Sequence, residues 1–206
     1  MEKTKNQLER YNHMLVEKNK IFNLTAHKTL ERSWEFNILD SLLFNDEIAK
    51  FFKQNARVID LGSGSGSPAI PIKLSFPQID LIMIDSTRKK VDFLTEVIAD
   101  LGLKNARAIH ARIEEFAKEK DSDGISKNKS VFDVVTARAV APLDTLLKLG
   151  FPLLKKGGAL LAFKGKNYAD EIEVAKHTLA RLGGKVLEIH EKQLGEQARS
   201  MLVIRR

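Results

Sequence analysis

The chain has no cysteine, five prolines and a single tryptophan among its 206 residues. Without cysteine it can form no disulfide framework, no thiolate metal site and no cysteine nucleophile. The five histidines show no metal-ligand spacing, so we predict no metal site and assign them no function. No apolar run approaches the roughly 20 residues of a membrane span, and the polar N-terminus does not resemble a signal peptide. We expect a cytoplasmic globular protein that does not enter a membrane.

Positive charge is in excess. The chain has 34 lysines and arginines against 27 acidic residues, which gives a net charge of +7 and a pI of about 9.5. A basic surface attracts polyanions such as nucleic acid. The same excess is compatible with a role in solubility alone, so charge by itself leaves both interpretations open.

The first quarter of the chain, residues 1–55, shows the periodicity of helices. Apolar residues recur at steps of three and four between charges, as at Leu8, Tyr11 and Leu15. The pattern predicts a first helix around these residues and further helices over 30–44 and 47–52. We expect a helical extension that forms one compact unit with the region that follows, residues 56–206.

Residues 56–206 alternate between short apolar runs and helical segments. The apolar runs predict seven strands, at about 57–61, 81–85, 107–110, 131–137, 159–165, 185–190 and 200–204. Helices are expected at 68–75, 87–101, 114–120, 143–154 and 169–182, with a polar loop over 121–130 and a turn over 155–158. This alternation implies an α/β fold with a parallel sheet and right-handed crossovers. No helix fits between the last two strands, so the final strand must be antiparallel.

The first predicted strand ends in a glycine-rich turn, Asp60-Leu61-Gly62-Ser63-Gly64-Ser65-Gly66. A strand, such a turn and a helix build a nucleotide-type pocket at the carboxyl edge of an α/β sheet. The spacing G-x-G-x-G, followed by Ser67 and Pro68, differs from the G-x-G-x-x-G of dinucleotide folds, which bind pyrophosphate. S-adenosylmethionine has no phosphate. It needs a flat backbone shelf and a carboxylate near its amine, which Asp60 can supply. A tight turn without a ligand is the structural alternative.

Asp85 ends the second predicted strand. An acidic side chain at that place can accept the hydroxyls of a ribose, or it can cap the helix that starts near Thr87. Ser86 can cap that helix as well, which would leave Asp85 for the ribose. A nicotinamide dinucleotide needs the same acid, so Asp85 does not separate an oxidoreductase from a methyltransferase.

Longer motifs identify a family that the chain resembles. The chain contains, in this order, NKIFNLTA, NILDSLL, VIDLGSGSGSPAIPIKLSFP, IDSTRKKVDFL, ARIEEF, FDVVTARAVAPL, PLLKKGG and FKG. From about residue 18 to the C-terminus it resembles the bacterial glucose-inhibited division protein B family, also called the ribosomal RNA small subunit methyltransferase G family. The resemblance implies a class I S-adenosylmethionine-dependent methyltransferase with a Rossmann-like sheet. It also implies methylation of N7 of guanosine 527 in the decoding-region loop of 16S rRNA.

The resemblance further implies cofactor contacts at Gly62, Ser67, Ile113, Glu114 and Arg138. Three positions depart from the family. Ser67 stands where phenylalanine or leucine is usual, Ile113 where alanine is usual, and Asn37 where histidine is frequent. Backbone contacts can serve at positions 67 and 113, whereas a role for the histidine cannot be transferred to Asn37. The predicted cofactor site joins these contacts with Asp60, Gly64, Gly66 and Asp85.

The sequence also limits the chemistry. Methylation of pyrimidine C5 usually needs a cysteine, and methylation of the adenine amine usually needs an N-P-P-Y type motif, where this chain has Thr136-Ala137-Arg138-Ala139. Guanine N7 already carries an in-plane lone pair, so its methylation needs alignment and exclusion of water and no general base. We assign Arg138 an orienting role toward the cofactor or an RNA phosphate. An ion pair of Arg138 with Asp133 or Asp144 is the structural alternative.

Basic residues follow the strands that end at the predicted pocket: Arg88, Lys89, Lys90, Lys164 and Lys166. With Arg138 they would share one sheet edge, where we predict contact with the 16S rRNA of the small ribosomal subunit. Taken singly, each is an ordinary solvated charge. Basic residues between positions 3 and 20 could extend this surface. Trp34 and Phe36 could stack on bases, although helical spacing favours a core position for Trp34.

Three other functions stay open at this point. They are methylation of another RNA, a protein or a small molecule; RNA binding without catalysis; and a nicotinamide-dependent oxidoreductase. The intact glycine turn, with Asp60 and Asp85, argues against a lost cofactor site, and the charge together with the family motifs favours RNA. Nothing in the sequence suggests an obligate interface, so we expect a monomer.

Overall fold

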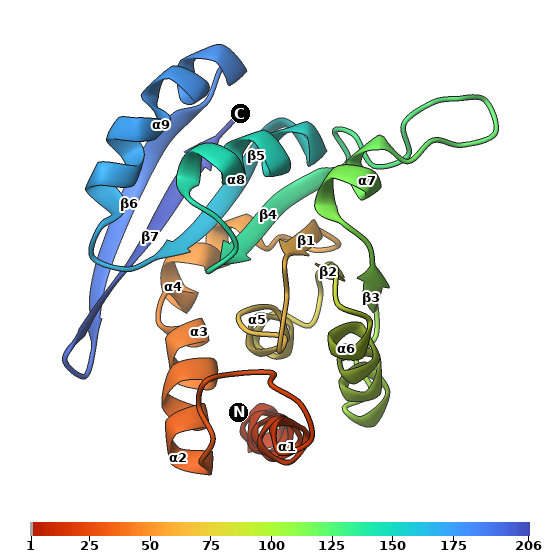
Figure 1. The fold of residues 1–206 in the computed structure, drawn as a ribbon, viewed down its shortest axis with the longest axis vertical. Coiled ribbons are helices and arrows are strands. Elements are labelled where there is room, and N and C mark those ends of the chain that lie inside the picture. The colour runs from red at the N-terminus through yellow and green to blue at the C-terminus, as the bar shows by residue number, and fades with distance from the viewer. Residues whose placement is uncertain (1) are drawn as a thin grey trace.

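Seven strands form one mixed sheet in the computed structural model, which describes residues 2–206 (Figure 1). They are β1 (Arg57–Leu61), β2 (Asp80–Asp85), β3 (Ala106–His110), β4 (Phe132–Arg138), β5 (Leu154–Lys164), β6 (Lys185–Leu194) and β7 (Gln197–Arg205). Their order across the sheet is β3-β2-β1-β4-β5-β7-β6. Strands β1 to β5 pair in parallel, and β7 runs antiparallel to both β5 and β6. The predicted seven-stranded sheet with an antiparallel last strand is confirmed.

Both faces of the sheet are buried because the central strands are apolar on both sides. Val58 and Leu81 belong to one hydrophobic cluster, and their neighbours Ile59 and Ile82 belong to another. The first cluster includes residues of α5 (Ala69–Ser75) and α6 (Arg88–Asp100); the second includes residues of α7 (Ile113–Lys118), α8 (Leu143–Gly150) and α9 (Tyr168–Leu182). Helices on both faces leave the carboxyl ends of the strands open for a ligand.

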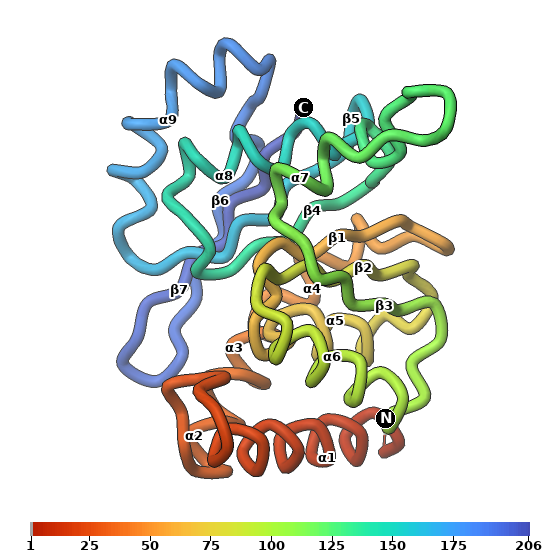
Figure 2. Tube along the Cα trace, turned by 45° about the vertical axis from the view of Figure 1, so that its right-hand side comes forward, coloured from red at the N-terminus to blue at the C-terminus, as the bar shows by residue number. Residues whose placement is uncertain are grey.

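The helices before β1 pack on the first of these faces. They are α1 (Glu2–Asn19), α2 (Leu30–Ser33), η1 (Trp34–Leu39), α3 (Asp40–Leu42), α4 (Asn45–Ile48) and η2 (Ala49–Phe51). Tyr11 and Leu15 of α1 lie in the same cluster as Ile70 of α5 and Leu94 of α6, and Figure 2 shows α1 running beneath both helices. The helical extension therefore shares a hydrophobic core with the sheet. None of the helices within residues 2–206 is long and apolar enough to span a bilayer.

The segment predicted as one helix over 30–44 contains a change of helix type. Its middle part, η1, is a π-helix, and the backbone N–H of Asp40 donates to the carbonyl of Glu35, five residues back. Trp34, in the first turn of η1, packs against the hydrophobic core as its spacing favoured. Short π-helical segments inside α-helices are frequent at functional sites because they leave carbonyls free for other donors.

The chain before β5 differs from its prediction. The helix expected over 143–154 ends at Gly150, and Phe151–Leu153 (η3) form a 3₁₀ turn. Pro152 has no backbone N–H and cannot continue an α-helix. The turn expected over 155–158 is part of β5, which shifts register against β4 and passes Gly157 at a φ of 79°.

Candidate functional site

The glycine turn connects β1 to α5 and rests on the end of β2. The backbone N–H of Ser63 donates to Ile84 O at 2.9 Å, and the N–H of Gly64 donates to Asp85 Oδ2 at 2.9 Å. Gly62 and Gly64 have φ values of 62° and 56°, in the left-handed region that side chains rarely adopt. Glycine at these two positions therefore lets the turn fold back against the neighbouring strand.

The glycines of this turn face different surroundings. A Cβ at Gly66 would lie 2.8 Å from Ile70, 2.9 Å from Leu94 and 3.0 Å from the Tyr11 hydroxyl. A Cβ at Gly64 would meet nothing closer than Gly62 O, at 3.8 Å. Gly66 thus serves the packing of α1, α5 and α6, whereas the Cα of Gly64 faces open space.

Asp60 is the most deeply buried carboxylate of the site, with 1% of its surface exposed. Its Oδ1 accepts a hydrogen bond from Thr136 Oγ1 at 2.6 Å, and its Oδ2 has no partner among the described residues. Burial raises the pKa of this carboxyl to about 6. A buried carboxylate oxygen without a partner suits a ligand that brings a cationic amine.

Asp85 accepts two backbone hydrogen bonds. Its Oδ1 accepts the N–H of Thr87 at 2.8 Å, and its Oδ2 accepts the N–H of Gly64. Thr87 is itself the N-cap residue of α6 and no side chain caps this helix, so neither Asp85 nor Ser86 acts as its cap. Each carboxylate oxygen retains a second lone pair, so Asp85 still fits a ribose hydroxyl. Ile113 and Glu114 begin α7, which starts two residues after β3, the strand that pairs with β2.

A cavity of about 750 Å³ opens at the carboxyl ends of β1 and β4, where the order of the strands reverses. Gly62, Gly64, Ser67, Lys90 and Arg138 line it, together with residues of the N-terminal extension and of β7. The lining from these last two regions includes Leu24, Thr25, His27, Phe36, Asn37, Asp40, Phe44, Gln197 and Arg199. Asp60, Gly66, Asp85, Ile113 and Glu114 do not line it, although Asp60 and Asp85 contact residues of the turn.

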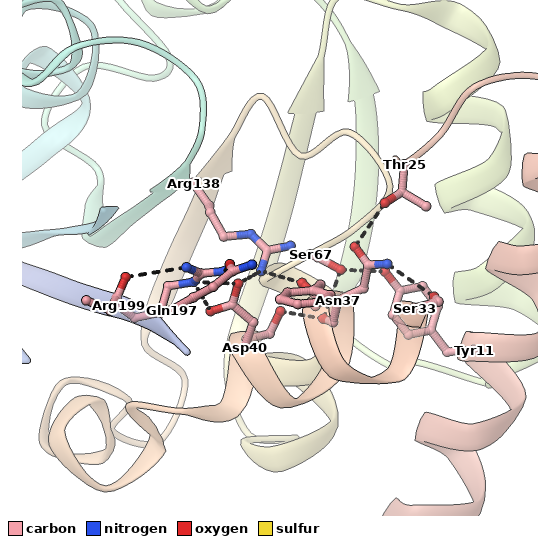
Figure 3. A network of polar contacts seen from close by, with 12 residues as sticks. Tyr11, Thr25, Ser33, Asn37, Asp40, Ser67, Arg138, Gln197 and Arg199 are labelled. Atoms are coloured by element: carbon pink, nitrogen blue, oxygen red, sulfur yellow. Dashed lines mark hydrogen bonds and ion pairs between the residues drawn. The ribbon is translucent and has the colours of Figure 1, made fainter. Parts of the chain in front are cut away.

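Arg138 is fixed by the N-terminal extension. Its Nη1 donates to Phe36 O at 3.2 Å and lies 3.4 Å from Asp40 Oδ2. Asp40 Oδ1 also accepts a hydrogen bond from Arg199 Nε at 2.9 Å. Both arginines therefore contact the same carboxylate (Figure 3). The alternative ion pairs of Arg138 are wrong, because Lys155 pairs with Asp133 and Lys148 pairs with Asp144. Burial lowers the pKa of Arg138, and the Asp40 carboxylate opposes this effect.

The π-helical segment holds the glycine turn as well. Because the N–H of Asp40 turns to Glu35, it does not occupy Phe36 O, which accepts Arg138 Nη1. The next carbonyl, Asn37 O, accepts Ser67 Oγ at 3.1 Å and Ser41 Oγ at 2.6 Å. The hydroxyl of Tyr11 donates to Ser65 O at 2.8 Å and lies 3.2 Å from Ser67 Oγ. A small polar residue at position 67 thereby joins α1, η1 and the turn (Figure 3).

The predicted basic residues differ in their availability. Arg88, Lys89 and Lys166 are exposed, and Lys90 is half-buried. The ammonium of Lys164 is held by Glu171 at 2.6 Å and by Ala141 O at 2.9 Å, with 10% of the side chain exposed. Lys164 is therefore an internal ion pair and is poorly placed to bind a phosphate.

Sequence reasoning did not select Tyr11, Asp40 or Arg199. Asp40 carried the only usable signal, since it is an acidic residue inside the otherwise apolar NILDSLL motif. Its partner Arg199 is 159 residues away in the chain. No spacing rule links two such positions. Within residues 2–206 no cluster of three potential metal ligands occurs.

The sheet order, the antiparallel β7 and the glycine turn at the switch point define a class I S-adenosylmethionine-dependent methyltransferase. Comparison with known proteins identifies the family. The family model described as GidB, rRNA small subunit methyltransferase G, matches residues 4–201, and the chain belongs to this family. It is 37% identical to the ribosomal RNA small subunit methyltransferase G of Staphylococcus aureus (strain JH9), over 98% of this chain and 82% of that protein.

Two solved structures share the fold at low sequence identity. A SAM dependent methyltransferase from Aquifex aeolicus has a TM-score of 0.58 and 16% identity, covering 84% of this chain and 93% of its own. TYW2 of P. horikoshii in complex with MeSAdo has a TM-score of 0.58 and 14% identity, covering 78% of this chain. The chain spans 61% of the length of that TYW2.

S-adenosylmethionine binding is expected to weaken as the pH falls through about 6. Below the raised pKa of Asp60 the carboxyl becomes neutral, and the unpaired Oδ2 no longer attracts the ligand's ammonium. The expected loss is about tenfold in affinity for each pH unit below 6. Titration calorimetry between pH 5 and pH 8 (roughly one unit below and two above that pKa) measures this change.

The matched variants are Asp60→Asn and Asp133→Asn. Asp60→Asn should bind weakly at every pH and lose the dependence. Asp133 lies at the start of β4, where its carboxylate accepts hydrogen bonds from the Arg57 N–H and Lys155 Nζ. Because this carboxylate does not belong to the cofactor turn, Asp133→Asn should keep the pH dependence of binding. An affinity of the wild-type protein that stays constant across this range would rule out Asp60 as the partner of the amine.

Proposed function

We propose that this protein transfers the methyl group of S-adenosylmethionine to N7 of guanosine 527 of 16S rRNA in the small ribosomal subunit. The observation that carries the proposal is the cavity in which the glycine turn, Arg138 and the N-terminal extension meet. Membership of the small subunit methyltransferase G family supports the same substrate.

The geometry suits a reaction that needs alignment more than proton transfer. The bound cofactor supplies a methyl group on a positively charged sulfur, and guanine N7 supplies the lone pair, so no proton has to be removed. The backbone at Gly62 and Gly64, which lines the cavity, would hold the methionine part. Asp60 and Asp85 contact the turn without lining the cavity, and their carboxylates would attract the amine and the ribose hydroxyls, respectively. Correct positioning of two reactants contributes up to roughly 7–11 kcal/mol.

Arg138 acts in this scheme as a positioning residue. The methylated guanine becomes positively charged, so a free cation beside the base would oppose the reaction. Asp40 lies between Arg138 and Arg199 and neutralises part of their charge. Arg138 can thus brace the extension against the end of β4 without repelling the product.

The decisive experiment is methyl transfer to isolated small subunits and to bare 16S rRNA, followed by mapping of the modified base. We expect incorporation of one methyl group per subunit, at guanine N7. Incorporation elsewhere, or none with either substrate, would refute the proposal. Titration calorimetry with S-adenosylmethionine and with nicotinamide dinucleotide separates the oxidoreductase alternative, since only the first should bind.

RNA contact is proposed for the exposed basic residues beside the cavity. Affinity for small subunits should fall steeply with salt, because each bound phosphate releases counterions. The triple variant Arg88→Ala, Lys89→Ala, Lys166→Ala should reduce the slope of log K against log salt by roughly one for each phosphate that is no longer bound.

The control for this surface lies at the opposite edge of the sheet. Lys53 and Lys104 are exposed and precede β1 and β3, so the double alanine variant should keep the wild-type slope. Equal slopes for the triple variant and the wild-type protein would place the RNA contact elsewhere.

We also propose that the protein acts as a monomer in the cytoplasm. Light scattering in solution measures the oligomeric state.

A further inference from the structure

Part of the cavity wall is aromatic. The rings of His27 and Phe36 are stacked, with centroids 4.6 Å apart and planes inclined by 22°, and both residues line the cavity. The guanidinium of Arg32 lies 4.4 Å from the centroid of Phe36. Phe36 is only 5% exposed, whereas His27 is half-buried, so His27 is the ring that a ligand in the cavity can reach.

The loop that carries His27 is tied by hydrogen bonds to the end of α1 and to η1. Asn19 Oδ1 accepts the backbone N–H groups of Leu24 and Thr25, at 2.7 and 3.0 Å. Thr25 Oγ1 donates to Asn37 Oδ1 at 3.3 Å, which ties the loop to the π-helical segment. The imidazole is therefore presented by an anchored loop, and a ligand would not have to order it on binding.

We propose that His27 is the platform on which the target guanine stacks during methyl transfer, with Phe36 supporting the imidazole from behind. This inference rests on the proposed function. Enzymes that modify a base take it out of its stack and hold it against aromatic or apolar side chains. The glycine turn and this aromatic stack line the same open cavity.

The charge of the imidazole fits the reaction. Methylation at N7 makes the purine cationic, and a neutral ring attracts a cation over its face, whereas an imidazolium repels it. Burial lowers the pKa of His27, and the nearby guanidinium groups of Arg32 and Arg138 add to this effect. The carboxylates of Glu35 and Asp40 oppose it. His27 is thereby kept neutral around pH 7.

The test compares His27→Ala with His27→Phe on isolated small subunits at saturating S-adenosylmethionine. His27→Ala should lower kcat about 10- to 100-fold, as expected when one stacking interaction is removed, with KM and cofactor affinity little changed. His27→Phe should keep a near wild-type kcat. The wild-type rate should decline as His27 becomes protonated in acid, and His27→Phe should lack this decline, which a purely structural role would not produce.

The control is His13→Ala, which removes an exposed histidine of α1 outside the cavity and should leave kcat unchanged. Normal turnover by His27→Ala, or equal losses in the alanine and phenylalanine variants, would overturn the platform. A wild-type protein that methylates no guanine would instead refute the proposed function. Thermal unfolding of each variant, compared with the wild-type protein, shows whether a reduced rate comes from a disrupted fold.

Discussion

Arg138→Ala is expected to reduce kcat/KM for methyl transfer by about 100-fold while the protein stays folded. The side chain joins three parts of the site, since it leaves the end of β4, donates to Phe36 O and pairs with Asp40. Without this side chain the extension loses its polar contacts with the end of β4. The distance across the cavity between the extension and β4 is then no longer fixed. The rate of methylation of small subunits gives the result. Circular dichroism of the variant checks that it is folded.

A conservative variant and a control variant test whether the loss is specific to the Arg138 guanidinium. Arg138→Lys should lose nearly as much activity, because one ammonium cannot reproduce a planar group that faces a carbonyl and a carboxylate together. Arg181→Ala removes an exposed arginine of α9 and should retain full activity. Near-normal turnover by Arg138→Ala would refute a positioning role. A separate measurement of cofactor affinity in this variant shows whether Arg138 acts on the cofactor or on the RNA.

Gly66→Ala is expected to destabilise the protein by about 2–5 kcal/mol, the sum of overpacking and of strain at a positive φ. Its Cβ would overlap Ile70 and Leu94, and the backbone there has a φ of 98°. This loss is a large part of the stability of a typical domain. Denaturant unfolding of the protein without ligand measures it.

Gly64→Ala is the matched variant, two residues away in the same turn. The space around its Cβ is open, so its cost in stability should be only about 1–2 kcal/mol, from backbone strain. Its methyl group would stand in the cavity, however, and cofactor affinity should fall at least about tenfold. If the two variants were equally stable, or if Gly64→Ala bound the cofactor normally, the separate roles assigned to these glycines would be wrong.

The parts of the fold that local patterns encode could be predicted from the sequence. Apolar runs such as Leu81–Asp85 indicated strands, and the spacing of Gly62 and Gly64 indicated the turn. The end of α8 was misplaced because Pro152 stops the helix before the apolar pattern does. Lys164 was predicted to bind RNA, and its pairing with Glu171 depends on how the chain turns from β5 into α9.

The connections of the site could not be predicted in the same way. Arg199 and Asp40 meet only because β7 is inserted beside β5, which brings the C-terminal hairpin to the extension. The Tyr11 hydroxyl reaches Ser65 O through the core, 54 residues along the chain. Helical periodicity placed Tyr11 on an apolar face and gave no indication of its polar contact.

The π-helical segment makes the register of the extension depend on a single residue. An α-helix turns by about 100° per residue, so removing one residue from η1 and restoring regular α-helical bonding would rotate everything that follows relative to α2. Asp40 would then face away from Arg138 and Arg199, although no residue of the site had been substituted. In this protein we expect the deletion of one amino acid from η1, whose residues Phe36, Asn37 and Ile38 are buried, to be as consequential as a mutation at the cofactor turn.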